Sequence, residues 1–224
     1  MKITLLGYGK MGRTIEKLAT ADGHEVVLRV DEANRPDIAS ADLQNSDVAI
    51  DFSRPDAAIA NIHLALGAGI PVVVGTTGWL AELPAVREAV ANQQGGLFYA
   101  SNFSIGVNLF FATANYLAER MRTEPYDVSI EETHHTEKLD APSGTALTLA
   151  EGVSQALAIP AVPIASIREE DVPGTHELTF TSEIDTITLR HVAHSREGFA
   201  RGALAAATWM IGRRGVYTMA DLLR

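Results

Sequence analysis

The fold of this chain is decided by Lys2-Ile3-Thr4-Leu5-Leu6-Gly7-Tyr8-Gly9-Lys10-Met11-Gly12. An apolar run that predicts a strand comes first, and residues 13–21 then have the composition of a helix. Between them the glycines follow the spacing Gly-x-Gly-x-x-Gly. The first permits a tight turn, the second lets a pyrophosphate approach the backbone, and the third allows close helix–strand packing. This order of strand, glycine loop and helix predicts a dinucleotide-binding site.

The acidic residue after the second predicted strand supports the same interpretation. Residues 25–30 form another apolar run, and Asp31 follows it directly. A carboxylate about 20 residues beyond the glycine loop can hydrogen-bond the ribose hydroxyls of an adenosine. Since a glycine turn alone also occurs in other α/β proteins, this acid is what favours a dinucleotide.

Strand and helix patterns continue to alternate through the first hundred residues. Residues 48–52, 72–75 and 97–100 predict strands, and residues 57–66 and 80–93 predict helices. Such alternation favours a parallel, doubly wound sheet, which binds ligands at the carboxyl ends of its strands. The segments that follow these strands are Asp51-Phe52-Ser53-Arg54-Pro55, Gly75-Thr76-Thr77-Gly78 and Ser101-Asn102-Phe103-Ser104.

The second half of the chain predicts a different architecture. A long apolar helix is expected first, and a second helix follows with Ser143 as its natural N-cap. The strand patterns after it are separated by no long helix, so they should form an antiparallel or mixed sheet. The predicted helices are residues 105–122 and 144–157, and the predicted strands are residues 127–132, 164–168, 177–181 and 186–192.

Together these patterns predict an α/β fold with two domains. The first is an N-terminal Rossmann-like dinucleotide-binding domain, residues 1–104, and residues 197–224 should pack back onto it. The second is a C-terminal α+β domain with an open mixed sheet, residues 105–196.

Composition excludes several classes of partner. The chain has 28 acidic and 18 basic residues, and its formal net charge of -10 repels nucleic acid and anionic membranes. It has no cysteine, which excludes disulfides, thiolate catalysis and Cys-based zinc sites. The N-terminal apolar run is too short for a signal peptide, and no stretch approaches the roughly 20 apolar residues of a membrane span. We therefore expect a cytoplasmic protein.

Reactive side chains gather in residues 131–146, Glu-Glu-Thr-His-His-Thr-Glu-Lys-Leu-Asp-Ala-Pro-Ser-Gly-Thr-Ala. The imidazoles of His134 and His135 and the ammonium of Lys138 can act as proton donors. The helix expected to begin at Gly144 offers free backbone N–H groups to an anion. This combination predicts a site that binds a carboxylate and protonates a nearby atom.

The same residues have other interpretations. Adjacent histidines at a strand end point to opposite sides, so one of them could act while the other binds. The pair could also be buried and hydrogen-bonded without chemistry, and Lys138 in isolation would be a surface lysine. A metal site is the third alternative, but neighbouring histidines rarely chelate one ion and no His-Glu-x-x-His pattern is present. We therefore predict no metal ligand.

Residues 132–146 resemble the signature of the dihydrodipicolinate reductase family, now called 4-hydroxy-tetrahydrodipicolinate reductases. The glycine motif and the segments after the strands match the family in the same order, so the resemblance spans nearly the whole chain. It implies reduction of the cyclic dicarboxylate 4-hydroxy-tetrahydrodipicolinate to tetrahydrodipicolinate by hydride from NAD(P)H, in lysine and diaminopimelate biosynthesis. It also implies that residues 105–196 are the substrate-binding and oligomerisation domain, which forms a homotetramer through its sheet.

The resemblance further implies a role for each matching residue. His134 would be the general acid and Lys138 a second proton donor. His135, Gly144 and Thr145 would bind the substrate. The implied cofactor-binding residues are Gly7, Tyr8, Gly9, Lys10, Met11, Gly12, Asp31, Gly75, Thr76, Thr77, Ala100, Ser101, Asn102 and Phe103.

Two departures from the family pattern concern the cofactor. The chain looks shorter than many members, and few residues link Asp31 to Asp47, beside the adenosine ribose. Many members carry an arginine just after the acid, where it can meet a 2′-phosphate, whereas this chain has Glu32. A second acid should repel that phosphate, so we predict a preference for NADH over NADPH, unless Arg35 reaches the phosphate.

Two rival functions are weaker. One is another Rossmann-type NAD(P)-dependent amino-acid or semialdehyde dehydrogenase. It would explain the glycine motif, but not the presence of both His-His-x-x-Lys and Pro-Ser-Gly-Thr within residues 134–145. A catalytically silent NAD(H)-binding regulatory protein would be expected to lose its proton donors, and both His134 and Lys138 are present.

Overall fold

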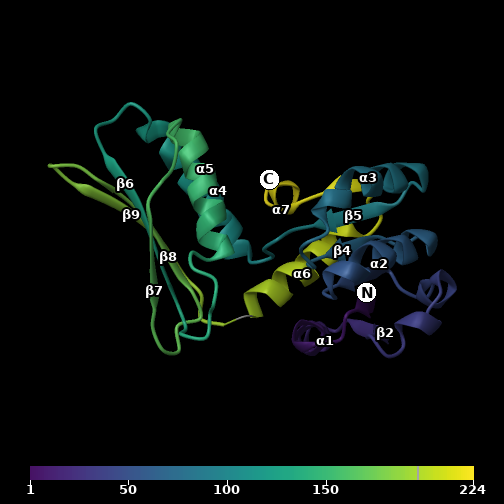
Figure 1. Cartoon of the computed structure of the whole chain (residues 1–224). Coiled ribbons are helices and arrows are strands. Elements are labelled where there is room, and N and C mark those ends of the chain that lie inside the picture. The colour runs from purple at the N-terminus through teal and green to yellow at the C-terminus, as the bar shows by residue number, and fades with distance from the viewer. Residues whose placement is uncertain (196) are drawn as a thin grey trace. The chain divides into compact units, whose positions relative to one another are not determined.

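The computed structural model describes residues 1–195 and 197–224. They form two compact units, one of Met1–Ile105 with Phe199–Arg224 and the other of Gly106–Gly198. Each unit contains its own sheet and its own hydrophobic core (Figure 1). No helix among the described residues is long and apolar enough to cross a membrane.

The first unit is built on a six-stranded parallel sheet in the order β10-β5-β4-β3-β1-β2. Its parallel pairing confirms the predicted Rossmann-like fold. The unpredicted member is β10, which pairs with β5 at the sheet edge. The strands are β1 (Lys2–Leu6), β2 (Glu25–Val30), β3 (Val48–Asp51), β4 (Val72–Val74), β5 (Gly96–Tyr99) and β10 (Gly215–Tyr217).

Helices cover both faces of this sheet. Successive strand residues point to opposite faces, so Phe98 of β5 packs in one core and Leu97 in the other. The first core includes Ala203 and Met210 of α6 together with Ile15 of α1, and the second is formed with α2 and α3. The helices are α1 (Lys10–Ala21), α2 (Pro55–Gly67), α3 (Leu83–Asn92), α6 (Glu197–Met210) and α7 (Met219–Leu222), with short 3₁₀ helices η1 (Arg35–Asp37), η2 (Ser40–Leu43) and η3 (Leu80–Glu82).

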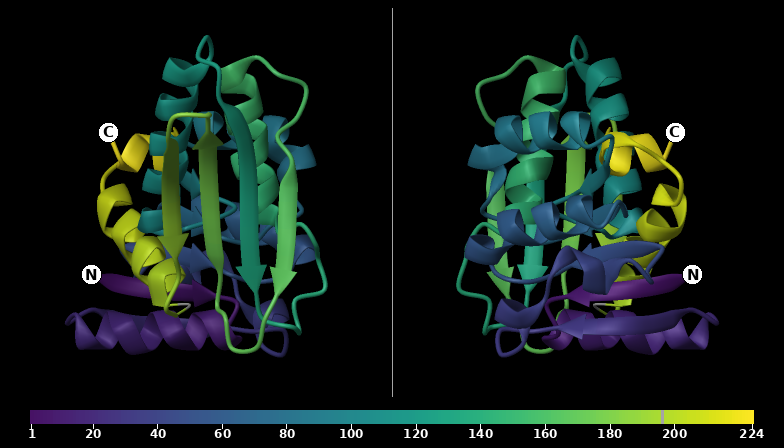
Figure 2. Two further views of the ribbon diagram at one scale, coloured as in Figure 1. Left: turned by 90° about the vertical axis from the view of Figure 1, so that its left-hand side faces the viewer. Right: turned by 90° about the vertical axis from the view of Figure 1, so that its right-hand side faces the viewer.

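The second unit has a four-stranded mixed sheet in the order β7-β6-β8-β9. Strand β6 is parallel to β7 and antiparallel to β8, which pairs antiparallel with β9, and this confirms the predicted mixed sheet. Helices α4 and α5 pack on one face, while the left view of Figure 2 shows the other face. The elements are α4 (Ile105–Met121), β6 (Asp127–His134), α5 (Gly144–Leu157), β7 (Ile164–Arg168), β8 (Thr175–Thr181) and β9 (Thr186–Val192).

Some predicted boundaries were wrong. Strand β6 continues to His134 instead of ending at Glu132, because its last residues pair with neighbouring strands. The helix predicted over residues 80–93 is divided into η3 and α3. Proline lacks a backbone N–H and fits only the first turn of a helix, so Pro84 places the start of α3 at Leu83.

Candidate active site

The glycine loop between β1 and α1 has the shape that a bound pyrophosphate requires. Gly7 has a φ of 96°, and a Cβ there would collide with the carbonyl oxygen of Phe52. A Cβ at Gly12 would collide with the carbonyl oxygen of Gly7, so glycine allows α1 to start close to the loop. At Gly9, the N-cap of α1, an added Cβ would meet nothing within 4 Å. An anion can therefore approach the N-terminus of this helix.

A cavity of about 780 Å³ lies beside this loop. Gly7, Tyr8, Gly9 and Asp31, four of the predicted cofactor residues, line it together with residues that follow β3. The carboxyl ends of parallel strands are where doubly wound sheets bind dinucleotides. The loop, the helix N-terminus and the acid after β2 therefore fit the adenosine and pyrophosphate parts of NAD(P).

Two acids and two guanidinium groups meet along the cavity wall. Asp31 is exposed, and Glu32 beside it pairs with Arg54 at 3.4 Å. Arg35 donates from Nε to Oδ1 of Asn61 at 2.7 Å, so its guanidinium is held against α2. The carboxylates that could bind ribose hydroxyls and the guanidinium groups that could bind a 2′-phosphate therefore line the same cavity.

Asp51 is a buried acid that organises the loops around the cavity. Its Oδ1 accepts the backbone N–H of Ser53 at 3.0 Å and lies 3.4 Å from Nδ2 of Asn61. The N–H of Ser53 also reaches Oγ1 of the predicted residue Thr76 at 2.8 Å. Burial raises the pKa of Asp51 to about 6, although hydrogen bonds from Ser53, Asn61 and Thr76 work to lower it.

The other predicted cofactor residues lie outside this cavity. The Phe103 side chain is buried against the rings of Phe52 and Phe98, so a ligand can meet only its main chain. At Gly75 a Cβ would collide with the Phe52 ring. Lys10, Thr77 and Ser101 are exposed, and Met11, Ala100 and Asn102 are half-buried.

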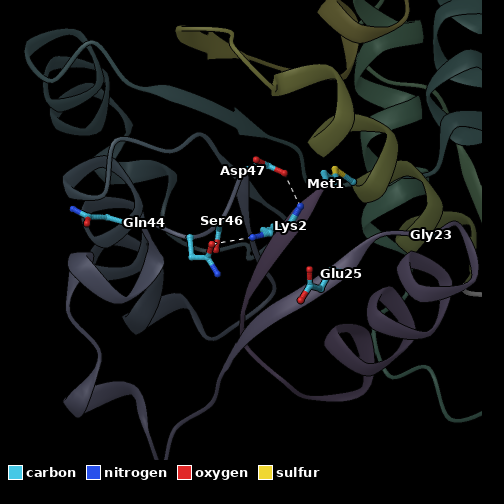
Figure 3. A pocket seen from close by; sticks show the side chains of 8 residues that line it. Met1, Lys2, Gly23, Glu25, Gln44, Ser46 and Asp47 are labelled. Atoms are coloured by element: carbon cyan, nitrogen blue, oxygen red, sulfur yellow. Dashed lines mark hydrogen bonds between the residues drawn. The ribbon is translucent and has the colours of Figure 1, made fainter.

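A second cavity of the first unit, about 460 Å³, lies near the amino ends of β1 and β2 (Figure 3). The backbone N–H of Lys2 donates to Asp47 at 2.6 Å, and its ammonium donates to Asn45 at 3.0 Å. These polar groups satisfy one another, and the strands begin rather than end here. We assign this cavity no part in the dinucleotide site.

In the second unit, His134 lies at the end of β6 on the face that α4 and α5 cover. Glu132 precedes it by two residues and therefore faces the same side of the strand. Glu132 is 0% exposed and His134 is 8% exposed. The Oε2 atom of Glu132 hydrogen-bonds Nδ1 of His134, and Oε1 accepts from Nη1 of Arg168 at 3.0 Å. Register places Arg168 of β7 directly beside His134.

Burial and the neighbouring charges together shift the pKa values of Glu132 and His134. Burial works to raise the pKa of Glu132, but hydrogen bonds from Ser166, Arg168 and His134 outweigh it and hold that pKa below its usual range. Burial lowers the pKa of His134, and the hydrogen bond and negative charge of Glu132 offset part of this effect. The positive charges of Lys138 and Arg168 lower it further.

His176 of β8 connects this cluster to the start of α5. Its ring lies 5.1 Å from that of His134 in an edge-on arrangement. Its Nε2 lies 3.1 Å from Oγ of Ser143, the predicted N-cap, and this Oγ accepts the N–H of Ala146. Burial lowers the pKa of His176 to about 4, so its ring is neutral near pH 7 and Nε2 can accept a hydrogen bond from the Ser143 hydroxyl.

The remaining predicted residues surround the start of α5. Gly144 is exposed with open space where a side chain would be, and Thr145 and His135 are half-buried. The ammonium of Lys138 contacts both carboxylate oxygens of Asp140, at 2.7 and 2.8 Å. The helix N-terminus is therefore accessible to an anion, with a lysine nearby in sequence.

Sequence reasoning assigned no role to Glu132, Arg168 or His176. The donor atoms of Glu132, His134 and His176 lie within 4.8 Å of one another, a spacing that a metal ion could use. However, Glu132 already binds Arg168, whose positive charge disfavours a second cation. We therefore interpret the cluster as a network of buried, hydrogen-bonded side chains.

Both parts of the chain match models of one protein family. Residues 1–103 match "Dihydrodipicolinate reductase, N-terminus" and residues 106–223 match "Dihydrodipicolinate reductase, C-terminus". The chain belongs to the dihydrodipicolinate reductase family. The resemblance inferred from residues 132–146 and the glycine motif is thereby confirmed.

Individual members of the dihydrodipicolinate reductase family agree with this assignment. The 4-hydroxy-tetrahydrodipicolinate reductase of Christiangramia forsetii is 45% identical over 237 residues, covering 100% of this chain and 98% of that protein. The enzyme of that name from Methanosarcina mazei is 38% identical over 198 residues, covering 80% and 73%. A dipicolinate-bound dihydrodipicolinate reductase from Paenisporosarcina sp. TG-14 shares the fold, with a TM-score of 0.84 and 24% identity over 97% of both chains.

Replacing Asp51 with Asn should change how stability depends on pH. The pKa of Asp51 rises from 3.8 to about 6 on burial, so its contribution to stability is largest below 3.8 and is lost as pH rises through about 6. The amide of the Asp51→Asn variant carries no charge at any pH in this range. Relative to the native protein, the unfolding free energy of Asp51→Asn should therefore increase by about 3 kcal/mol between low and mildly alkaline pH. Urea unfolding across that range measures the change.

The matched control is Asp37→Asn, which removes a carboxylate from an exposed position of η1. Its stability relative to the native protein should change little over the same pH range. A difference for Asp51→Asn that stays constant with pH would contradict the buried, protonatable Asp51.

Proposed function

We propose that this chain catalyses the NAD(P)H-dependent reduction of 4-hydroxy-tetrahydrodipicolinate to tetrahydrodipicolinate, a step of lysine and diaminopimelate biosynthesis, with His134 as the general acid. The observation that carries the proposal is the full-length match to a reductase of that name, at 45% identity. The buried pair of Glu132 and His134 supplies a proton donor, and the glycine loop supplies a dinucleotide site. A cytoplasmic location is part of the same proposal.

The start of α5 is the proposed binding place for a substrate carboxylate. Gly144 and Thr145 follow the N-cap Ser143, so their N–H groups have no partner in the preceding turn of the helix. A substrate carboxylate would compete with the Asp140 carboxylate for the Gly144 N–H. The positive end of the helix and the ammonium of Lys138 offset the overall negative charge of the chain. We assign His135 to the same carboxylate-binding group.

The proton donors act on the carbon atom next to the one that receives hydride. Bound NAD(P)H supplies that hydride to C4 of the substrate-derived ring. His134 then gives a proton to C3, or Lys138 supplies or relays it. Burial of His134 keeps bulk water away from this proton.

The cavity wall favours NADH as the preferred cofactor, with NADPH accepted less well. Asp31 and Glu32 present two carboxylates beside the expected position of the adenosine ribose. Arg35 is held by Asn61, and Arg54 by Glu32 and Asp56, so both guanidinium groups already have partners. A 2′-phosphate would have to compete for them.

A homotetramer is the proposed assembly, formed through the sheet face that α4 and α5 leave uncovered. That face carries exposed Ser129, Glu131, Thr188 and Arg190. Because strand residues alternate between faces, this uncovered face is separate from the one that holds Glu132 and His134.

The test of function is oxidation of NADH and NADPH in the presence of substrate generated in place from pyruvate and aspartate semialdehyde by the preceding synthase. We expect substrate-dependent loss of reduced nicotinamide absorbance, with higher kcat/KM for NADH. No loss with either cofactor, in folded protein that binds NADH, would refute the reductase. Equal efficiency with both would refute only the preference.

Glu32→Arg should move the cofactor preference toward NADPH. The new guanidinium could bind the 2′-phosphate, and Arg54 would keep only Asp56 as an acidic partner. A hydrogen bond to a charged group is worth about 1.5–3 kcal/mol, so the NADPH/NADH ratio of kcat/KM should rise roughly 10- to 100-fold. Glu88→Arg, an equal charge change at an exposed position of α3, should leave the ratio unchanged.

His134→Gln should reduce kcat by about 10²–10⁴, the usual contribution of a positioned general acid, while KM changes far less. Steady-state kinetics with saturating NADH measure both constants. His63→Gln, at an exposed position of α2, is the matched control and should behave as the native enzyme. Near-native turnover in His134→Gln would remove His134 from the mechanism.

A further inference from the structure

We infer that Glu132, held in place by Arg168, is a positioning residue that commits Nδ1 of His134 to an internal hydrogen bond and leaves Nε2 to give the proton to substrate. The inference rests on the proposed role of His134 as general acid. It assigns functions to two residues outside the predicted set of proton donors and ligand-binding groups.

The first support is that the Glu132 carboxylate has both oxygens in use. It is fully buried, with Oε2 on His134 and Oε1 on Arg168. A carboxylate bound at both oxygens cannot rotate without breaking a charged hydrogen bond in a region that water does not reach. The imidazole ring that binds it is therefore fixed in orientation as well.

The second support is the way Arg168 is anchored. Its Nε donates to the carbonyl of Lys138 at 3.2 Å, and its Nη2 donates to the carbonyl of Asp140 at 2.6 Å. The same guanidinium reaches Glu132, so it joins β6 to the segment that carries Lys138. Arg168 thus fixes His134, through Glu132, and the segment of Lys138 relative to each other. The planar guanidinium allows this because it donates several hydrogen bonds in fixed directions.

The third support is the surroundings of the other ring nitrogen. A Cβ at Gly174 would lie 3.0 Å from Nε2 of His134, so any side chain there would crowd that atom. A glycine at this position avoids that contact. With Nδ1 facing Glu132, the geometry points to Nε2 as the nitrogen that acts.

The charges around His134 explain why the carboxylate matters for chemistry. Glu132 favours the protonated ring, whereas Arg168 of β7 and Lys138 of the following loop disfavour it. His176 of β8 faces the ring edge-on, and His191 of β9 lies beyond it. Removing the negative charge of Glu132 would leave His134 among cations, and its protonated form would become harder to reach.

The proton transfer balances with Glu132 ionised throughout. Once the substrate ring has lost its 4-hydroxyl group as water, a hydride supplied by NAD(P)H would form the C4–H bond and leave NAD(P)⁺. The Nε2–H bond of the imidazolium breaks, a C3–H bond forms, and the C3=C4 double bond becomes a single bond. The imidazole ring is left neutral with its remaining proton on Nδ1, still donated to Glu132. After the product has left and solvent can enter the site, Nε2 takes up a proton for the next turnover.

The test compares Glu132→Gln with Glu119→Gln, the same change at an exposed position of α4. For Glu132→Gln we expect kcat to fall about 10- to 100-fold, the range typical of groups that orient a functional histidine, with KM nearly unchanged. The alkaline limb of the kcat profile should move to lower pH, so the loss is smallest in acid. Glu119→Gln should match the native enzyme in kcat, KM and pH profile.

A double variant separates this inference from the proposed function. If Glu132 acts through His134, then adding Glu132→Gln to His134→Gln should cost little further activity. Full additivity, or an unchanged pH profile in folded Glu132→Gln, would overturn the inference and leave the reductase assignment intact. A native enzyme without reductase activity, or one unaffected by His134→Gln, would refute the proposed function instead.

A measurement on the native enzyme applies even if Glu132→Gln fails to fold. In ¹⁵N-histidine-labelled protein, the His134 signals, assigned by their loss in His134→Gln, report the state of each ring nitrogen. We expect the neutral ring to carry its proton on Nδ1. A neutral ring protonated on Nε2 would overturn the inference.

Discussion

The buried charge of Glu132 is the constraint on which the second unit depends. A carboxylate without access to water has to be paired and hydrogen-bonded, so Arg168 must reach it from β7 and His134 from its own strand. Because β6 is paired on both sides, strand register decides which side chains meet there. The pairing that satisfies this buried charge is therefore also what positions His134, the proposed proton donor, and fixes the orientation of its ring.

The first unit relies on backbone shape where the second relies on charge. Positions 7 and 12 require glycine, because main-chain carbonyl oxygens occupy the space that a side chain would need. Gly9 leaves the start of α1 open. Around this loop, Asp51 binds groups from α2 and from the segment after β4. A dinucleotide site thus results from tight packing at two glycines and from one buried acid that ties neighbouring loops together.

Local signals predicted most of the fold and part of the site. Helix α5 and its cap Ser143 were predicted to the residue, since the capping side chain and the helical pattern are adjacent in sequence. Strand β10 was missed because three residues carry no pattern and are held only by pairing with β5. Arg168 and His176 were missed for the same reason: they reach His134 through register across β7 and β8. The two-residue spacing of Glu132 and His134 was the usable signal of their pairing.

A crystal structure of the protein with NADH and dipicolinate would test the account most directly. We predict that a ligand carboxylate will bind the N–H groups of Gly144 and Thr145. The ligand ring should face Nε2 of His134, whose Nδ1 stays on Glu132, and the pyrophosphate should lie at Gly9. A ligand bound away from the start of α5, or a His134 ring turned so that Nδ1 faces the ligand, would contradict it.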